Sequence, residues 1–353
     1  MHCKQTDSDS LAAVRDFIDR PQQRYLFGAT PYAAGIIKSI PVKGVIDDFF
    51  EQPSFHGVPV IRISDAPKDA VVVFTNLGRP LTAKSSLQDA QLTACDYFFF
   101  HNHSGLKLPE ARFWSGFGDD VRENLLELEQ VRGKLADSIS VDTFDRILNF
   151  RLSADLNFLS PFTERQEYQY FEKFLQLKSA GEVFCDVGGF DGRTTQDFIA
   201  SCPGFKAAYV FEPDPKNFSN IQKKFVDEVK VQLHNCGLGS ERAKVRFLSS
   251  GSTSSVSNDG NFEVQLEKLD SFRIDNLTFL KMDIEGAELL ALEGASQTIS
   301  RCKPRMAICV YHNASDLWQI PQKVLSIFDS YNIYLRHYTE GVTETVMFFI
   351  PKK

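Results

Sequence analysis

The chain has 353 residues, 43% of them hydrophobic and 24% charged, as in a globular protein with a sizeable core. At this length two domains are more usual than one. The formal net charge of −7 argues against an electrostatic nucleic-acid binder, and no apolar run approaches the roughly 18 residues that span a membrane.

The cysteines and the N-terminal residues favour a reduced compartment. The 7 cysteines are widely spaced and include no CxxC pair, which predicts neither a zinc site nor a disulfide framework. The first residues, MHCKQTD, lack the apolar core of a secretion signal. We therefore expect a cytoplasmic protein.

The first part of the sequence alternates short apolar strands with helices. Because parallel strands are joined by helical crossovers, this alternation predicts a Rossmann-like α/β domain over 1–108. Helices are predicted at 11–20 and 29–37, and strands at 25–27, 42–46, 58–61, 70–74 and 96–100.

Residues 109–178 have a different character, with more charged and helix-favouring residues. Leu125, Leu128 and Val131 recur at helical spacing. This pattern predicts a helical connector rather than a flexible linker. Its helices are expected at 119–135, 140–150 and 163–177.

From 179 to 353 the α/β alternation returns and predicts a second domain. The last two strands are close in sequence and predict a terminal antiparallel hairpin. The Ser-, Thr- and Gly-rich segment 249–257 predicts a loop, either an ordinary solvated loop or a lid over a substrate. Strands are predicted at 183–187, 207–211, 229–234, 278–282, 305–311, 333–337 and 346–350, with an extra strand at 244–248.

The loop at 186–192, with the sequence DVGGFDG, follows the first strand of the second domain. Its glycines allow a sharp turn and close approach to a bulky ligand. A dinucleotide site would instead favour G-x-G-x-x-G with a diphosphate at the helix N-terminus. Asp186 and Asp191 would repel a diphosphate, but they can hold the ammonium of a methionine moiety. The charge pattern therefore favours S-adenosylmethionine over NAD.

Acidic and polar residues after the next strands extend this site. Glu212 ends the second strand, where a carboxylate can accept hydrogen bonds from ribose hydroxyls. Asn235, Cys236 and Gly237 follow the third strand and are expected to line an adenine pocket. The predicted cofactor-binding residues are Asp186, Gly188, Gly189, Asp191, Gly192, Thr194, Thr195, Glu212, Pro213, Asn235, Cys236, Gly237 and Asp283.

Four separated segments resemble the FkbM family of methyltransferases. They are FLKMDIEGAE at 279–288, preceded by Leu-Asp at 269–270, the loop at 184–192, Phe-Glu-Pro at 211–213, and the stretch 142–174 with its LNFRL and Tyr-Phe-Glu motifs. The resemblance covers about 120–353. It implies a class I methyltransferase sheet, S-adenosylmethionine as the cofactor, and O-methylation of a hydroxyl, commonly on a sugar or glycan and sometimes on a polyketide.

Asp283, His312 and Glu285 are the predicted catalytic residues. Asp283 and His312 end neighbouring strands at the sheet edge where ligands gather. His312 is the preferred general base, since an unperturbed His pKa lies near neutral pH; a structural histidine is the alternative, as is a helix cap for Asp283. A divalent metal held by Asp283 and Glu285 is less favoured, so no metal ligand is predicted. Glu288 could reach the site, but a position on the helix surface is favoured. Lys281 is expected in an ion pair or in catalysis.

The first domain carries an incomplete nucleotide-binding pattern. The segment 28–35, GATPYAAG, follows a strand, and Asp47 ends the next one. However, Thr30 and Ala33 replace two of the glycines, and Pro31 removes an N–H that a phosphate could use. A scaffold, dimerisation or substrate-presenting role is therefore favoured over a nucleotide site.

Two further groups are interpreted as structural. His101 and His103 have the spacing of metal ligands, but no nearby residue completes a set, so a polar turn at a strand end is favoured. Tyr168, Tyr170 and Phe171 are more typical of a helix core than of a binding site.

The sequence thus predicts an S-adenosylmethionine-dependent O-methyltransferase acting on a sugar, a glycan or a related hydroxyl acceptor. The alternatives are methylation of a polyketide or other small metabolite, and a regulatory protein that binds the cofactor without turnover. A NAD-dependent oxidoreductase is disfavoured. The expected partner is a carbohydrate-like or small-molecule acceptor, without nucleic acid or a membrane span, and a homo-oligomer is left open.

Overall fold

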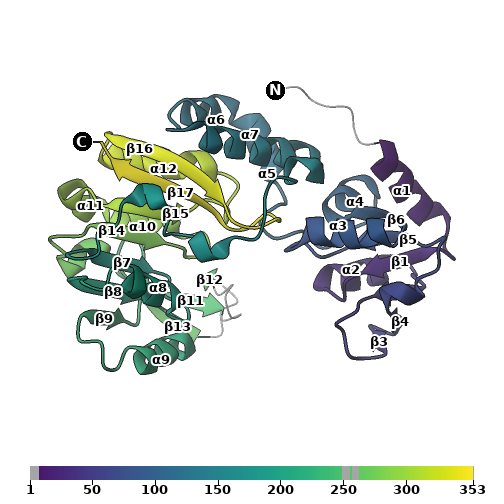
Figure 1. Ribbon diagram of the computed structural model, residues 1–353, viewed down its shortest axis with the longest axis horizontal. Helices are drawn as coiled ribbons and strands as arrows, with labels where there is room; N and C mark the ends of the chain where they lie inside the picture. The colour runs from purple at the N-terminus through teal and green to yellow at the C-terminus, as the bar shows by residue number, and fades with distance from the viewer. Residues whose placement is uncertain (1–7, 249–254, 257–261, 353) are drawn as a thin grey trace. The chain divides into compact units, whose positions relative to one another are not determined.

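Figure 1 shows the protein as a computed structural model, in which residues 8–248, 255–256 and 262–352 are described. The chain divides into two compact units. The predicted connector 109–178 is shared between them, and the predicted loop 249–257 falls outside the described residues except for 255–256. Unit 1 contains Met1–Glu123, Phe144–Glu164 and Tyr338–Thr343, and unit 2 contains Asn124–Thr143, Arg165–His337 and Glu344–Lys353.

Unit 1 is built on a six-stranded sheet with the order β3-β4-β2-β1-β5-β6. Neighbouring strands in this sheet are parallel, except for the antiparallel pair β3 and β4. The strands predicted at 25–27, 42–46, 58–61 and 70–74 are confirmed. The strands are β1 (Arg24–Phe27), β2 (Gly44–Ile46), β3 (Ser54–Phe55), β4 (Val58–Ile61), β5 (Val71–Phe74) and β6 (Thr93–Asp96), and the helices are α1 (Ser8–Asp19), α2 (Pro31–Ser39), α3 (Pro80–Asp89), α4 (Tyr97–His103) and α5 (Phe117–Glu123), with the 3₁₀ turn η1 (Ile63–Asp65).

The strand predicted at 96–100 is wrong. Strand β6 ends at Asp96, whose carboxylate accepts the backbone N–H of Phe99 at 2.9 Å and caps helix α4. Residues 97–100 are all buried, and a short buried helix has the same continuous apolar pattern as a buried strand. His101 and His103 therefore lie in the last turn of a helix, and the predicted strand-end turn is also wrong.

Asp96 is a buried carboxyl group beside a cavity in unit 1. The cavity has a volume of about 230 Å³ and is also lined by Lys84 and Leu156. Burial raises the pKa of Asp96 to about 7, against the opposing effect of the hydrogen bond from Phe99. The folded protein therefore resists ionisation of this group.

Replacing Asp96 by Asn should stabilise the protein more at pH 8 than at pH 5. The unfolded chain ionises this carboxyl near 3.8 and the folded chain near 7, so the cost of ionisation grows between these values and is complete above 7. Asn keeps a capping oxygen without the charge. We expect a gain on the order of 2 kcal/mol at pH 8, measured by thermal unfolding. The exposed Asp89→Asn is the control, and an equal gain at both pH values would contradict the assignment.

The helices predicted at 119–135 and 140–150 are confirmed as α5, α6 (Leu125–Arg132) and α7 (Ser138–Ser153). The helix predicted at 163–177 is wrong, because this segment forms the 3₁₀ turns η3 (Gln166–Tyr168) and η4 (Lys173–Leu175). Tyr170 and Gln176 have φ angles of 72° and 49°, which a continuous right-handed helix does not accommodate. A further turn, η2 (Leu156–Phe158), follows α7.

Unit 2 contains a seven-stranded sheet with the order β16-β17-β15-β14-β7-β8-β9. Strand β17 is antiparallel to both of its neighbours, and the other pairs are parallel. The predicted α/β sheet with a terminal antiparallel hairpin is thus confirmed. The strands are β7 (Val183–Val187), β8 (Ala207–Phe211), β9 (Val231–His234), β14 (Phe279–Met282), β15 (Arg305–Cys309), β16 (Tyr331–His337) and β17 (Thr345–Pro351).

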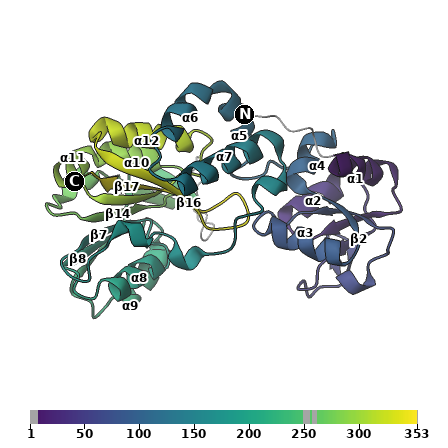
Figure 2. The same ribbon diagram turned by 45° about the horizontal axis from the view of Figure 1, so that its top comes forward.

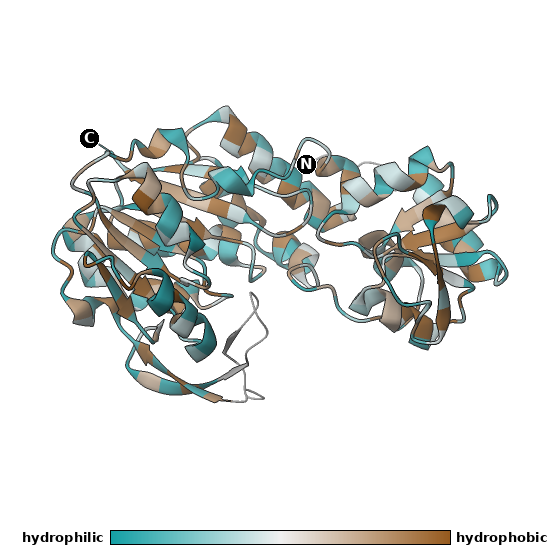
Figure 3. Cartoon of the chain, turned by 60° about the horizontal axis from the view of Figure 1, so that its bottom comes forward, coloured by the Kyte–Doolittle hydropathy of each residue, from teal (hydrophilic) through white to brown (hydrophobic). Residues whose placement is uncertain are grey.

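Helices cover both faces of this sheet. In Figure 2, α8 and α9 lie on one face, and α10, α11 and α12 lie on the other. The hydropathy colouring of Figure 3 places the apolar residues mainly in the strands and the polar residues on the outer faces of the helices. The helices are α8 (Arg193–Ser201), α9 (Pro215–Lys224), α10 (Glu288–Gly294), α11 (Ser296–Cys302) and α12 (Asp316–Ile327), with the 3₁₀ turn η6 (Leu269–Phe272).

A smaller sheet in unit 2 has the order β10-β13-β11-β12. The sequence predicted β11 at 244–248 but not its partners. They are β10 (Gly237–Leu238), β11 (Ala243–Leu248), β12 (Ser255–Val256) and β13 (Phe262–Glu267). Among the described residues, none of the helices has the length and hydropathy needed to cross a membrane.

The topology of the large sheet fixes where a ligand can bind. The chain continues from β7 to β8 on one side and from β14 to β15 on the other, while β7 and β14 are neighbours. The crevice beyond their carboxyl ends is therefore the switch point at which open α/β sheets bind ligands. The loop 186–192 follows β7, and Asp283 follows β14.

Candidate active site

The loop 186–192 turns sharply at two glycines with positive φ, Gly188 at 85° and Gly192 at 77°. The backbone N–H groups of Gly188 and Gly189 both donate to the carbonyl of Phe211 at 3.0 Å. A Cβ on Gly188 would lie 1.9 Å from the carbonyl oxygen of Asp283. Only a glycine therefore lets the loop lie this close to the residue that follows β14.

Lys281 and Asp186 form a buried ion pair beneath this loop. The Nζ of Lys281 lies 3.2 Å from Oδ1 of Asp186, and both side chains are almost fully buried. Nζ also donates to the carbonyl of Gly188 at 2.6 Å, and Thr195 donates to the other oxygen of Asp186. Burial would lower the pKa of Lys281, but Asp186, Asp283 and Cys309 together outweigh burial and raise the pKa. Asp186 thus holds the loop from inside, and its contact with a cofactor stays a prediction.

The other predicted cofactor residues are arranged around Glu212. Its carboxylate accepts the backbone N–H groups of Phe190 at 2.8 Å and Asp214 at 2.9 Å. Burial raises the pKa of Glu212 to about 7. Asn235 donates to the carbonyl of Glu212 at 2.9 Å, which joins the ends of β8 and β9.

The remaining predicted cofactor residues have mixed environments. Cys236 is buried, and Gly237 lies in β10 against Leu266 and Pro213. Asp191 is exposed, and its carboxylate accepts the N–H of Arg193 at the start of α8. The position of Asp191 before α8 is suited to capping the helix and also to contacting a ligand.

Asp283 is held by a residue that the sequence did not single out as functional. The hydroxyl of Tyr170 donates to Oδ2 of Asp283 at 2.8 Å, and the Lys281 ammonium lies 5.2 Å from the Tyr170 ring centre. Burial would raise the pKa of Asp283, but Lys281 and then His312 outweigh it and lower the pKa. The sequence marks Tyr170 only as part of the Tyr-Phe-Glu motif and does not place its hydroxyl, because the position of the side chain depends on the left-handed backbone at this residue.

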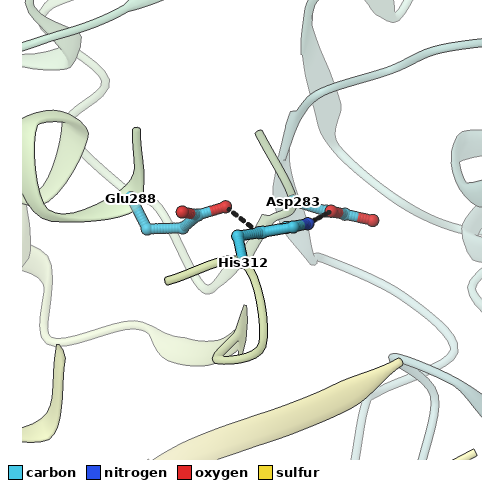
Figure 4. A group of neighbouring side chains, drawn as sticks. All are labelled: Asp283, Glu288 and His312. Carbon is cyan, nitrogen blue, oxygen red and sulfur yellow. Dashed lines mark hydrogen bonds and ion pairs between the residues drawn. The ribbon is translucent and has the colours of Figure 1, made fainter. Parts of the chain in front are cut away.

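His312 lies among three carboxylates, as Figure 4 shows for two of them. Its Nδ1 is 2.8 Å from Oε1 of Glu288, and its Nε2 is 3.4 Å from Oδ1 of Asp283 and 3.8 Å from Oε2 of Glu285. The structure therefore brings the three predicted catalytic residues together. The residue predicted on the helix surface, Glu288, is fully buried, so that prediction is wrong.

The surroundings of His312 change its expected protonation. Burial would lower its pKa, but Glu288, Asp283 and Glu285 outweigh burial and raise the pKa to about 9. The imidazole is therefore protonated near neutral pH, and the unperturbed pKa used to favour it as a base does not apply. His312 also lies three residues beyond the end of β15, rather than in the strand itself.

In unit 1, the polar residues of the nucleotide-like pattern form hydrogen bonds within the protein. The carboxylate of Asp47 accepts the N–H groups of Ala29 at 2.8 Å and Phe49 at 2.9 Å, and Thr30 caps α2 through the N–H of Ala33. These contacts are what a structural loop needs. The preference for a scaffold, dimerisation or substrate-presenting role over a nucleotide site stays a prediction.

Residues 186–338 match the model of the methyltransferase FkbM domain. This chain carries an FkbM methyltransferase domain. The FkbM domain includes the loop 186–192, Glu212, Asp283, Glu288 and His312. No curated protein matches the chain significantly.

Among solved structures, the methyltransferase FkbM from Methylobacillus flagellatus KT is 24% identical, and the match covers 98% of this chain and 94% of that one with a TM-score of 0.79. It shows a shared fold over nearly the whole chain. An rRNA methylase from Streptococcus thermophilus (13% identity, 57% and 95% covered, TM-score 0.34) and a fibrillarin from Aeropyrum pernix with bound S-adenosyl-L-methionine (10%, 48% and 67%, 0.33) are too distant to support an argument.

Replacing Gly188 by Ala should destabilise the FkbM domain by about 3 kcal/mol or more, because the new Cβ overlaps the Asp283 carbonyl and the backbone must move. Gly181→Ala is the matched control, with a similar φ of 84° but nothing within 4 Å of the added carbon. It should cost only the strain of the left-handed backbone, about 1–2 kcal/mol. Urea unfolding measures both, and equal costs would refute the close approach.

Replacing Lys281 by Met should cost about 3–5 kcal/mol, because the change leaves the Asp186 carboxylate buried without its cation. Asp186→Asn should also destabilise the protein, by leaving the ammonium unpaired. The double variant should recover part of the loss, since neither charge then remains. Chemical unfolding of the four proteins gives the coupling, and purely additive losses would show that the pair does not interact.

Proposed function

We propose that the FkbM domain binds S-adenosylmethionine over the loop 186–192 and transfers its methyl group to a hydroxyl of a sugar, a glycan or a related acceptor. The observation that carries this proposal is the packing of Gly188 against Asp283. It makes the candidate cofactor loop and the candidate acceptor residues neighbours at the switch point of one sheet. Transfer between two bound molecules needs such an arrangement.

The cofactor assignment is supported by the charges around the loop. Asp191 lies in it and Glu212 accepts the N–H of Phe190 within it, while the charge of Asp186 is paired with Lys281. The groups that would favour a diphosphate are missing from the described residues 186–192, since they contain no Lys, Arg or His. Glu212 lies at the end of β8, where a carboxylate can accept the hydrogen bonds of a ribose. A sulfonium cofactor carries positive charge, which this acidic site attracts.

The acceptor assignment is supported by the polar side chains near His312. The side chains of Asp283 and Glu285 are 24% and 13% exposed, whereas those of His312 and Glu288 are at most 1% exposed. A ligand therefore meets two carboxylates first, and these accept hydrogen bonds from hydroxyl groups. A polyhydroxylated acceptor offers more such donors than an apolar polyketide, so it is favoured.

The transfer itself is an in-line displacement. A lone pair of the acceptor oxygen forms the new O–CH₃ bond as the S–CH₃ bond breaks, and the bonding pair stays on sulfur to give S-adenosylhomocysteine. The hydroxyl proton leaves to solvent. The residues of the chain bind and orient the two molecules and stabilise the charge that develops.

Asp283→Ala and His312→Ala should each lower turnover by about 100-fold or more, because the acceptor loses Asp283 or the buried imidazole beside that carboxylate. Both should bind S-adenosylhomocysteine within a few-fold of the unaltered protein, since the contact of Asp283 with the cofactor loop is made by its backbone carbonyl, which both variants keep. Release of S-adenosylhomocysteine, measured with a panel of sugars, glycans and small metabolites, gives turnover, and calorimetry gives binding.

The exposed Glu241→Gln is the control and should leave both values unchanged. Near-normal turnover in both alanine variants would remove the site assignment. Cofactor binding without turnover on any acceptor would favour a regulatory protein, and turnover confined to apolar metabolites would remove the sugar assignment.

A further inference from the structure

The cluster around His312 has the composition of a metal centre. One atom each from Asp283, Glu288 and His312 lie within 4.8 Å of one another, and Glu285 adds a carboxylate 3.8 Å from Nε2 of the histidine. Three carboxylates thus surround one imidazole. Even with the imidazole protonated, their formal charges sum to −2, because Lys281 is paired with Asp186. Such an excess in a partly buried site favours a bound cation.

The two nitrogens of His312 have different environments. The Nδ1 to Glu288 distance of 2.8 Å is that of a hydrogen bond, and because a carboxylate accepts, Nδ1 carries the proton. The same Glu288 oxygen accepts the backbone N–H of Ile284 at 2.9 Å, which fixes its position. Figure 4 shows Glu288 and Asp283 on opposite sides of the ring. Metal-bound histidines are oriented in this way by a carboxylate on their second nitrogen.

The distances on the Nε2 side suit a shared ion. Charge-assisted hydrogen bonds measure about 2.7–2.9 Å, whereas the distances to Asp283 and Glu285 are 3.4 and 3.8 Å. Two donors bound to one ion at about 2.1 Å lie about 3.4 Å apart at an angle of about 108°, and about 3.8 Å apart at about 130°. Tyr170 holds the other oxygen of Asp283 at 2.8 Å and so directs Oδ1 towards the histidine.

We propose that Nε2 of His312, Oδ1 of Asp283 and Oε2 of Glu285 bind a divalent transition-metal ion, with Glu288 as the positioning residue. One imidazole and two carboxylates are donors that Mn²⁺, Fe²⁺ and Zn²⁺ accept. This inference departs from the prediction of no metal ligand. The role given to the ion rests on the proposed function. An ion there binds the acceptor hydroxyl through an open position and makes it more acidic, so that its proton passes to solvent without a strong base.

The test is a Mn²⁺ titration of the chelator-treated full-length protein, followed by the electron paramagnetic resonance signal of free Mn²⁺. We expect one site, a nitrogen coupling from His312 in the bound spectrum, and at least about 100-fold weaker binding in His312→Ala and Asp283→Asn. Glu288→Gln should weaken binding about 10–100-fold, because the ligand loses its orientation. Glu285→Gln, which changes a loop residue and spares the buried core, should weaken it about tenfold.

The control is Glu293→Gln, an exposed carboxylate on the same helix as Glu288, which should bind Mn²⁺ unchanged. Absence of binding, or binding that His312→Ala and Glu285→Gln leave intact, overturns the inference. Calorimetry with S-adenosylhomocysteine, with and without Mn²⁺, separates the two proposals. Cofactor binding without any Mn²⁺ site refutes the metal alone, and a Mn²⁺ site without cofactor binding refutes the proposed function alone.

Discussion

The buried pair of Lys281 and Asp186 is the interaction on which the candidate site depends. It joins the two central strands, β7 and β14, at the point where their connections run in opposite directions. The same ammonium holds the Gly188 carbonyl and lies against the ring of Tyr170, which in turn holds Asp283. One cation thus fixes the geometry of the candidate cofactor loop and of the candidate acceptor residues together. The stability cost of burying it is offset locally by its carboxylate and carbonyl partners.

Much of the fold could be predicted from the sequence, because it rests on local patterns. The continuous apolar runs of β5 and β7 mark buried parallel strands, and the short spacing of β16 and β17 marks a hairpin. The loop 186–192 could be predicted because its sharp turn needs residues with positive φ, and the glycines that allow this are visible in the sequence. Asp283 and His312 could be placed at one site because the carboxyl ends of neighbouring parallel strands meet.

The failures share a different cause, which is that they depend on contacts between distant segments. The apolar run 97–100 has the sequence pattern of a strand, and only the cap at Asp96 distinguishes it from one. Glu288 has the helix position of a surface residue, and its burial follows from a histidine 24 residues away. The ion pair of Asp186 was likewise not predicted, because its partner Lys281 lies on another strand. A single sequence does not state such pairings.

The hairpin of β16 and β17 has a consequence for how the chain can be divided. Its strands belong to unit 2, while the residues between them, Tyr338–Thr343, belong to unit 1, where Glu340 accepts the N–H of Thr82 near the start of α3. The polypeptide therefore passes between the units at five places, and β17 fills an interior position of the large sheet. A single proteolytic cut cannot release either unit as one continuous fragment. Unit 1 includes the residues between the two strands of the hairpin, and unit 2 includes both strands. Neither unit is therefore complete without this C-terminal part of the chain.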